Sequence, residues 1–201
     1  MRLASASQRR LTLLQQVGLN PEVWPTHVDE TLWPGENAHH YVERMAKTKA
    51  LAGLAPEVDL VLGADTAVVL GGTHQPDGSY LGEEIMGKPT DANEAVAMLT
   101  RLSGKVHRVL TGVAVFADHE HSGISVVVET KVRFKILTIH EINAYVATQE
   151  PLDKAGAYAI QGIGAFLVAH VDGSYSGVVG LPLFETLEIL QSFGLTFCST
   201  R

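Results

Sequence analysis

Apolar residues recur along this chain at two spacings, which divide it into expected helices and strands. Apolar positions three or four residues apart, bounded by capping residues, predict five helices. These helices run from Ser7 to Gly18, from Asn37 to about Leu54, from Asp91 through Leu102, from Thr138 to about Thr148, and within residues 181–194. In the second of them the repeat places Tyr41, Met45, Thr48 and Ala52 along one side. In the fourth, Thr138 and Glu141 form a capping box.

A continuous apolar run at residues 58–65, VDLVLGAD, predicts a buried strand with Asp65 at its carboxyl end. Residues 67–72 can continue this strand. If they do, Thr66 points away from Asp65, because successive side chains of a strand alternate between its faces. Ligands of open α/β sheets bind at the carboxyl ends of strands. Asp65 is therefore a candidate functional residue.

Paired β-rich runs predict antiparallel hairpins. Residues 106–117 and 123–137, separated by a polar turn, predict one hairpin, and residues 165–180, with a central Asp-Gly-Ser turn, predict another. Residues 73–85 are rich in turn formers and predict a hairpin tip, whereas residues 150–164 have no clear period and predict a functional loop. Since helices alternate irregularly with antiparallel strand pairs, we expect an α/β fold with a mixed sheet.

Composition narrows the classes of function. The chain has 201 residues, of which 46% are hydrophobic, so we expect residues 1–201 to form a single domain. A formal net charge of -7 argues against a nucleic-acid partner or an anionic membrane surface. No apolar run is long enough for a membrane span, and a single cysteine, Cys198, fits a reducing compartment. We therefore expect a cytoplasmic protein.

The opening residues, LASASQRR, place Arg9 and Arg10 in the first turn of the first helix. A helix N-terminus carries partial positive charge, so cations are unfavourable there. The arrangement becomes favourable if an anion also binds, because free backbone N–H groups and guanidinium groups together form a phosphate cradle. The plainer interpretation is that both arginines are solvated surface charges. No Walker A or G-x-G-x-x-G pattern is present.

Four further charged residues are candidates for such a site. Asp65 could hold Mg²⁺ or accept a proton from water, and Glu30 could complete a metal site with it. Lys88 precedes a proline, which holds it extended and able to reach a phosphate. Lys49 adjoins an apolar helix face, from which it either snorkels to water or extends into a cleft. The plainer interpretations are a turn-capping aspartate and ordinary surface lysines.

Gln161 is a candidate for reading a nucleobase. Small residues flank Tyr158 and Gln161, and the Gln161 amide offers both an acceptor and donors, as the edge of uracil or thymine requires. The alternative is a core turn in which Gln161 binds the backbone. The nine histidines, including those at residues 39–40 and 119–121, form no zinc motif.

Together these residues resemble the Maf family of nucleoside triphosphate pyrophosphatases over nearly the whole chain. The matching motifs are LASASQRR, VDE, YVERMAKTKA, VLGADTAVV, GKPTDANEAVAMLTRLSGKVHRVLTGV, EPLDKAGAYAIQG and GSYSGVVGLPL. More narrowly, the chain is similar to the branch that cleaves dTTP and UTP, which has Arg9, Thr66 and Gln161 at positions tied to base choice. Gln8 stands where the family usually has proline, and residues 71–86 are longer than usual.

The resemblance implies a mixed α/β sheet in two lobes with a central cleft, akin to inosine triphosphatase. It implies that Asp65 is the proton acceptor, and that a divalent cation, Mg²⁺ or Mn²⁺, is the cofactor. It also implies a homodimer. The positions that it assigns to triphosphate binding are Ser5, Arg9, Arg10, Lys49 and Lys88.

Two alternatives to hydrolysis of dTTP and UTP stay open at this point. One is the same reaction with another base preference, such as 7-methylguanosine triphosphate or a modified pyrimidine nucleotide. The other is a non-catalytic nucleotide-binding regulator of cell division. The intact set of Asp65, Lys88 and the two arginines favours an enzyme.

Overall fold

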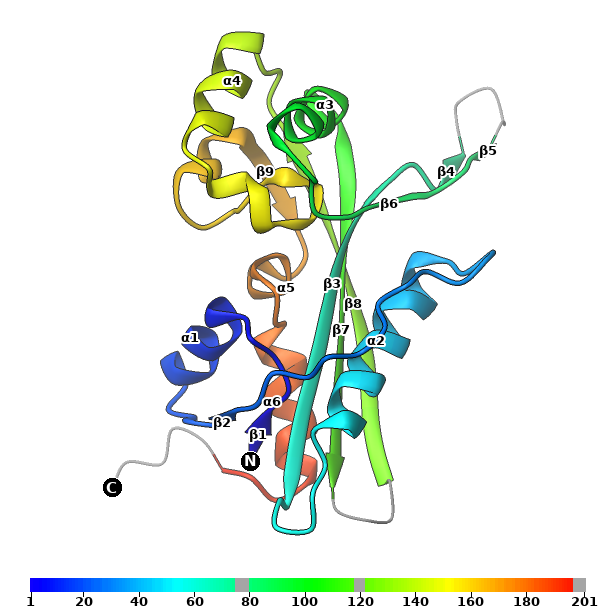
Figure 1. The fold of residues 1–201 in the computed structure, drawn as a ribbon, viewed down its shortest axis with the longest axis vertical. Coiled ribbons are helices and arrows are strands. Elements are labelled where there is room, and N and C mark those ends of the chain that lie inside the picture. Colours follow the sequence, from blue (N-terminus) through cyan, green and yellow to red (C-terminus); the bar gives the residue numbers. More distant parts are fainter. Residues whose placement is uncertain (75–79, 118–121, 197–201) are drawn as a thin grey trace. The chain divides into compact units, whose positions relative to one another are not determined.

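The computed structural model describes residues 1–74, 80–117 and 122–196 (Figure 1). The chain divides into two compact units. The first comprises Met1–Asp65, Thr111–Val128 and Ser176–Arg201, and the second comprises Thr66–Leu110 and Glu129–Tyr175. No helix in these described ranges is long and apolar enough to cross a membrane.

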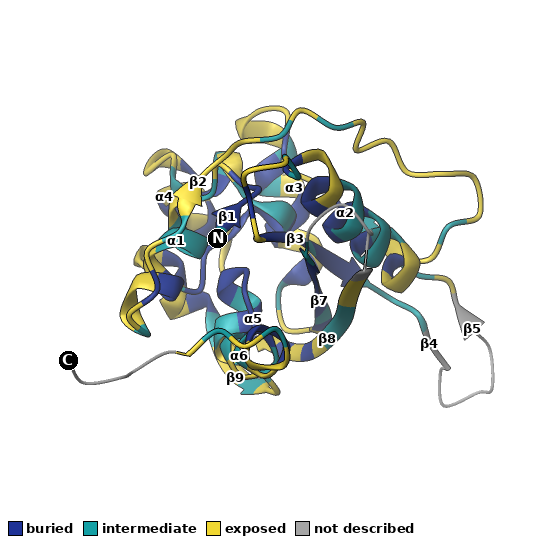
Figure 2. Ribbon diagram, turned by 90° about the horizontal axis from the view of Figure 1, so that it is seen from below, coloured by how far each residue is buried: buried dark blue, intermediate teal, exposed yellow. Residues whose placement is uncertain are grey.

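The strands form a mixed sheet in the order β2-β1-β3-β7-β8-β9, with β6 also paired to β3. Their bounds are β1 Arg2–Leu3, β2 Glu22–Val23, β3 Leu60–Leu70, β6 Glu84–Met86, β7 Val106–Ala117, β8 Ser122–Phe134 and β9 Val168–Asp172. Strand β1 pairs in parallel with β2 and β3, whereas β3–β6 and β8–β9 are antiparallel. The predicted α/β class with a mixed sheet is therefore confirmed. Figure 2 shows buried residues concentrated along β1, β3 and β7.

Five helices follow the predicted spans closely: α1 Gln8–Gln16, α2 Ala38–Ala52, α3 Ala92–Leu102, α4 Ile139–Ala147 and α6 Leu183–Ser192. The side chains of Asn37, Asp91 and Thr138 accept the expected capping hydrogen bonds, and the Thr138–Glu141 capping box is present. Ser7 occupies the N-cap position of α1, but its side chain makes no capping hydrogen bond. The capping residues therefore predicted the starts of these helices correctly, including α1, where Ser7 holds the N-cap position without a side-chain hydrogen bond.

Helix α2 packs with its backbone directly on β3 and β7. A Cβ on Gly63 would lie 2.3 Å from the carbonyl oxygen of Ala46, and one on Gly112 would lie 2.3 Å from that of Val42. The buried face of the helix therefore differs from the side that carries Tyr41, Thr48 and Ala52. The buried residues are Ala38, Val42, Met45, Ala46, Lys49 and Ala50, whereas Tyr41 and Thr48 are half-buried and Ala52 is exposed.

Strand β3 corrects the predicted position of Asp65. The strand continues without a break to Leu70, where Val68, Val69 and Leu70 pair with β6, so Asp65 lies in its middle and not at its carboxyl end. Asp65 belongs to the first unit and Thr66 to the second. The apolar residues after Asp65 extend the strand because they pair with β6.

Two other segments differ from their predicted structure. Residues 165–180 do not form a hairpin, because β9 pairs with β8. The chain turns at Gly173, whose φ is +126°, and Ser174 N–H donates to Thr130 Oγ1. Helix α5 (Tyr175–Val179) follows directly. Residues 150–164 contain 3-10 turns, so they are not the element-free loop that their composition predicts. These turns are η1 Glu150–Asp153 and η2 Ala155–Ala157, and η3 Ile163–Leu167 begins within the same residues.

The predicted hairpin tip is present as β4 (Thr73–His74) paired antiparallel with β5 (Tyr80–Leu81). Residues 75–79 between these strands lie outside the described residues. So do His119, His121 and Cys198.

Candidate active site

The ammonium of Lys49 joins two carboxylates in the first unit. Its Nζ lies 2.6 Å from Asp65 Oδ1 and 2.7 Å from Glu30 Oε1. The Lys49 and Asp65 side chains are nearly buried, at 10% and 11% exposed, whereas Glu30 is 52% exposed. Of the two alternatives for Lys49, the structure therefore gives the inward one, because its charge is held by Asp65 and does not snorkel to bulk water.

Lys49 and Asp65 meet because of how α2 packs on β3. Lys49 lies in the last turn of α2, and Asp65 lies two residues beyond Gly63 on β3, where the helix backbone approaches most closely. A buried cation and carboxylate in contact stabilise each other, but each alone would be costly to bury. This buried pair therefore fixes one positive and one negative charge beside each other in the first unit.

Arg10 and Ser5 form the second part of the cluster. Arg10 Nη1 donates to Ser5 Oγ at 3.1 Å, and Arg10 Nε donates to the Gly180 carbonyl at 2.8 Å. The same Ser5 oxygen accepts the backbone N–H of Ser7 at 3.2 Å. Burial lowers the pKa of Arg10, and the carboxylates of Asp65 and Glu30 oppose that effect. The Arg10 guanidinium is thus oriented by Ser5 and by the Gly180 carbonyl. It lies close enough to Asp65 and Glu30 to be affected by their charges.

Arg9 is half-buried in the first turn of α1. Its positive charge adds to the lowering of the Arg10 pKa, which is the repulsion expected of two neighbouring arginines at a helix N-terminus. An anion bound beside them would relieve this repulsion.

Glu30 and Asp65 fit the oxygen chemistry of a small divalent cation. Mg²⁺ in proteins is commonly held by one or two carboxylates together with substrate phosphates and water. Within residues 1–74, 80–117 and 122–196, no group of three or more histidine, cysteine or acidic side chains could hold a metal. A cation held by Glu30 and Asp65 would therefore need its remaining ligands from phosphate and water oxygens.

Tyr41 belongs to this cluster, although the sequence marked it only as one side of a helix. Its hydroxyl donates to the Glu30 carbonyl at 3.2 Å. Burial, with the nearby charges of Asp65 and Glu30, raises the pKa of Tyr41 to about 12, so the hydroxyl keeps its proton. The spacing of Tyr41 and Arg44 on one helix face is the signal that could have drawn attention to both.

The remaining candidates lie in the second unit and are described within it. Lys88 is exposed, whereas Thr66 is half-buried on β3. Gln161 is half-buried, and its side-chain amide has no hydrogen-bond partner among the described residues. Both interpretations of Gln161, as a reader of the base and as part of a core turn, stay predictions. Tyr158, by contrast, is buried, with its hydroxyl 2.8 Å from His107 Nε2.

The turn that carries Gln161 is held by Glu150. Its carboxylate accepts hydrogen bonds from the backbone N–H groups of Ile163 and Gly164 at 3.0 and 2.9 Å, and from the Tyr145 hydroxyl at 2.8 Å. Burial alone would raise the pKa of Glu150, but these donors hold it below its usual value. Glu150 thus fixes the backbone directly after Gln161.

Comparison with known proteins agrees with the motifs. A family model described as Maf-like protein matches residues 1–193. A protein of Anaeromyxobacter sp. (strain Fw109-5) named dTTP/UTP pyrophosphatase is 51% identical over 195 residues, which cover 96% of this chain and 88% of that protein. Proteins with the same name from Myxococcus xanthus (strain DK1622) and Escherichia coli (strain K12) are 50% and 48% identical, covering 96% and 95% of this chain and 92% and 91% of theirs.

Proposed function

Because this chain belongs to the Maf-like family, we propose that it hydrolyses dTTP and UTP to the nucleoside monophosphate and pyrophosphate, and so removes surplus or non-canonical pyrimidine nucleotides. The observation that carries the proposal is the contact of Lys49 with both Asp65 and Glu30. The cluster combines cations for phosphate oxygens with a carboxylate for a proton. Sequence identities of 48%, 50% and 51% to relatives named for this reaction support the choice of substrate.

The reaction follows from what these side chains can do. Arg10 and Lys49 bind and neutralise triphosphate oxygens, as in other phosphoryl-transfer sites. A water oxygen bonds to the α-phosphorus as the bond to the α–β bridging oxygen breaks, so pyrophosphate leaves. Asp65 accepts the proton of that water. A divalent cation, Mg²⁺ or Mn²⁺, held by Asp65 and Glu30 would supply further charge neutralisation.

The family resemblance supports a role for the second unit in the same reaction. In this proposal residues 1–201 act as one domain, with the substrate in a cleft between two lobes. Lys88 binds the triphosphate, and Thr66 and Gln161 read the pyrimidine edge. Ser5 and Arg9 complete the binding set, Arg9 at either phosphate or base. The resemblance also supports a cytoplasmic homodimer.

Pyrophosphate release from a panel of nucleoside triphosphates with Mg²⁺ or Mn²⁺ tests the proposal. The panel contains dTTP, UTP, dCTP, CTP, ATP, GTP and 7-methylguanosine triphosphate. We expect release from dTTP and UTP, lost in Asp65→Asn while UTP binding is retained. Preferred release from 7-methylguanosine triphosphate would overturn the base preference. Nucleotide binding without any release would overturn the reaction and favour a regulator.

A further inference from the structure

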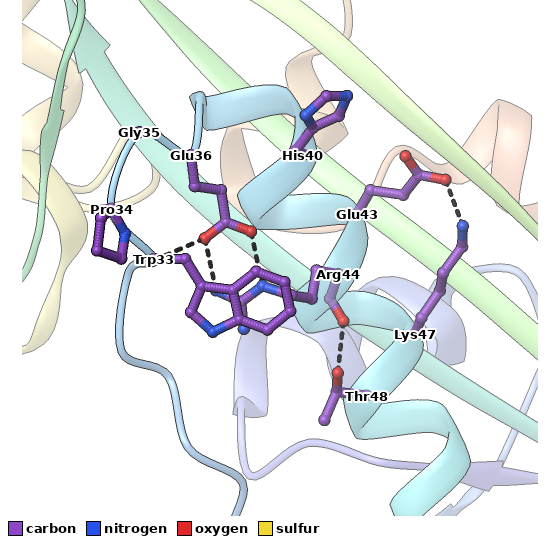
Figure 3. Close-up of a pocket in the computed structure, with 9 residues that line it drawn as sticks. All are labelled: Trp33, Pro34, Gly35, Glu36, His40, Glu43, Arg44, Lys47 and Thr48. Carbon is purple, nitrogen blue, oxygen red and sulfur yellow. Dashed lines mark hydrogen bonds and ion pairs between the residues drawn. The ribbon is translucent and has the colours of Figure 1, made fainter.

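Glu30 lies in a long segment without regular structure. Between β2 and α2 the chain has no helix or strand from residue 24 to 37, and residues 31–35 are exposed. A pocket of about 530 Å³ opens between the end of this segment and α2, lined by residues 33–36 and by side chains of the helix (Figure 3). The segment is therefore not packed flat on the helix, and polar contacts must hold it in place.

Two side chains on one face of α2 hold the backbone at Glu30. The Tyr41 hydroxyl donates to the carbonyl of Glu30 at 3.2 Å, and Arg44 Nη2 donates to the carbonyl of Thr31 at 3.0 Å. These are consecutive carbonyls, and the two donors are three residues apart on the helix. Side chains at that spacing share a helix face. The helix thus binds the backbone of the residue whose carboxylate contacts Lys49.

Arg44 also connects the far end of the segment to the helix. Its Nε and Nη2 donate to the two oxygens of Glu36, each at 2.6 Å, and Glu36 Oε2 accepts the backbone N–H of Trp33 at 3.1 Å (Figure 3). The guanidinium carbon lies 4.0 Å from the centre of the Trp33 ring. Glu36 is 6% exposed and Arg44 is 16% exposed, so this pair is shielded from water. Such a two-pronged pair is directional and stronger than an ordinary surface pair.

A local turn completes the arrangement. Asp29 Oδ1 accepts the N–H of Thr31 at 2.9 Å and its hydroxyl at 2.6 Å, which turns the chain around Glu30. The turn sets the local shape at Glu30, but it does not connect that shape to the rest of the unit. Tyr41 and Arg44 provide that connection.

We propose that Arg44 and Tyr41 are positioning residues that hold the Glu30 carboxylate at Lys49, and through it set the cation and phosphate site. This inference rests on the proposed function for its catalytic consequence, and on the contacts above for its structural one. Removal of these two side chains removes both hydrogen bonds from the helix to the backbone at Glu30 and so weakens the hold on its carboxylate at the ammonium.

Hydrogen exchange tests the structural consequence without any nucleotide or metal. In Arg44→Gln we expect faster amide exchange in residues 28–36, with exchange in β3 and α3 unchanged. Arg44→Lys, which keeps the charge but not the fork, should show most of this effect. Tyr41→Phe, which removes one hydroxyl and keeps the ring, should accelerate exchange near Glu30 alone. Arg101→Gln is the matched control, because Arg101 makes a two-pronged pair with Glu84 within the second unit. Unchanged exchange in residues 28–36 of Arg44→Gln would overturn the proposal.

A double-mutant cycle tests the catalytic consequence. Loss of a group that orients a metal ligand typically costs about 10- to 100-fold, so we expect Arg44→Gln to lower kcat/KM for UTP by at least about tenfold. In a Glu30→Gln background the same substitution should change kcat/KM by less than about twofold, because coupled residues are not additive. Equal losses in both backgrounds would show an effect unrelated to Glu30 and would overturn the proposal. Absence of turnover in the wild-type protein would instead overturn the proposed function, and the exchange result would still decide the positioning role.

Discussion

Lys49 Nζ lies 2.6 Å from Asp65 Oδ1, and neither side chain is more than 11% exposed. The two residues come from different elements, a helix and the middle of a strand, and each compensates the charge of the other. In the proposed reaction Asp65 also accepts the proton of the attacking water. Lys49 therefore supports both the stability of the first unit and the proposed chemistry.

The substitution Lys49→Met should be strongly destabilising, because it leaves a buried carboxylate without its cation. Breaking a buried pair by removing one partner typically costs about 3–5 kcal/mol. We expect Lys49→Met to lower the free energy of unfolding by an amount of this order, and Lys49→Met/Asp65→Asn to recover part of it. Urea denaturation of the single and double variants measures this. A double variant as unstable as Lys49→Met would contradict the argument.

The substitution Gln161→Glu should alter base selection more than folding. The side chain has no partner among the described residues, so the change breaks no internal hydrogen bond. A carboxylate cannot donate to the carbonyl oxygens of uracil or thymine, whereas an amide can. We expect a loss of kcat/KM for UTP and dTTP at nearly constant Tm. Equal losses on every nucleotide of the panel would argue that Gln161 has no part in reading the base.

His107 should make the protein sensitive to acid. The ring is 1% exposed, and burial lowers its pKa to about 4, from 6.5 in the unfolded chain. Between these values the unfolded chain binds a proton that the folded chain does not, so stability falls as the pH decreases from 6.5 to 4. At about 1.36 kcal/mol per pH unit, the loss approaches roughly 3 kcal/mol.

The variant His107→Gln tests this prediction, because glutamine has no proton to gain in that range. Unfolding free energies of both proteins should be measured at pH 7, 6, 5 and 4.5. The wild type should lose more stability than the variant over the series. Parallel pH curves for the two proteins would rule out His107 as the source of the sensitivity.

Gly63 should be intolerant of even a methyl group. A Cβ there would lie 2.3 Å from the Ala46 carbonyl oxygen and 2.6 Å from the Ala50 backbone nitrogen. Backbone atoms cannot yield as a flexible side chain can, so α2 must move and carry Lys49 with it. We expect Gly63→Ala to lower stability by about 1–3 kcal/mol, as overpacking typically does, and to lower turnover.

Gly82→Ala provides the comparison for this prediction. A Cβ at Gly82 meets no atom of the described residues within 4 Å, so the variant should fold and act as the wild type does. Thermal denaturation and pyrophosphate release from UTP measure both properties. Equal Tm values for the two variants would refute the claim that α2 packs directly on β3.

The helix boundaries could be predicted from the sequence because their signals are local. Asn37 and Asp91 accept a backbone N–H three residues ahead, and the Thr138–Glu141 capping box spans the same distance. Such hydrogen bonds depend on a few neighbouring residues, whatever the rest of the chain does. The candidate residues Asp65, Lys49, Glu30 and Arg10 were predicted from their residue types within short motifs, and their roles stay predictions.

What joins these residues depends on contacts between distant parts of the chain. Arg10 binds the carbonyl of Gly180, 170 residues away, and that carbonyl carries no side-chain signal in the sequence. The hairpin predicted around Gly173 is wrong, because Thr130 on β8 makes hydrogen bonds with the backbone N–H and carbonyl of Ser174. Spacing along one element can indicate which residues share a face. Which face of α2 is buried, and with it Lys49, depends on how closely the helix packs on Gly63 and Gly112 of two neighbouring strands. Only this packing brings Lys49 and Asp65 together.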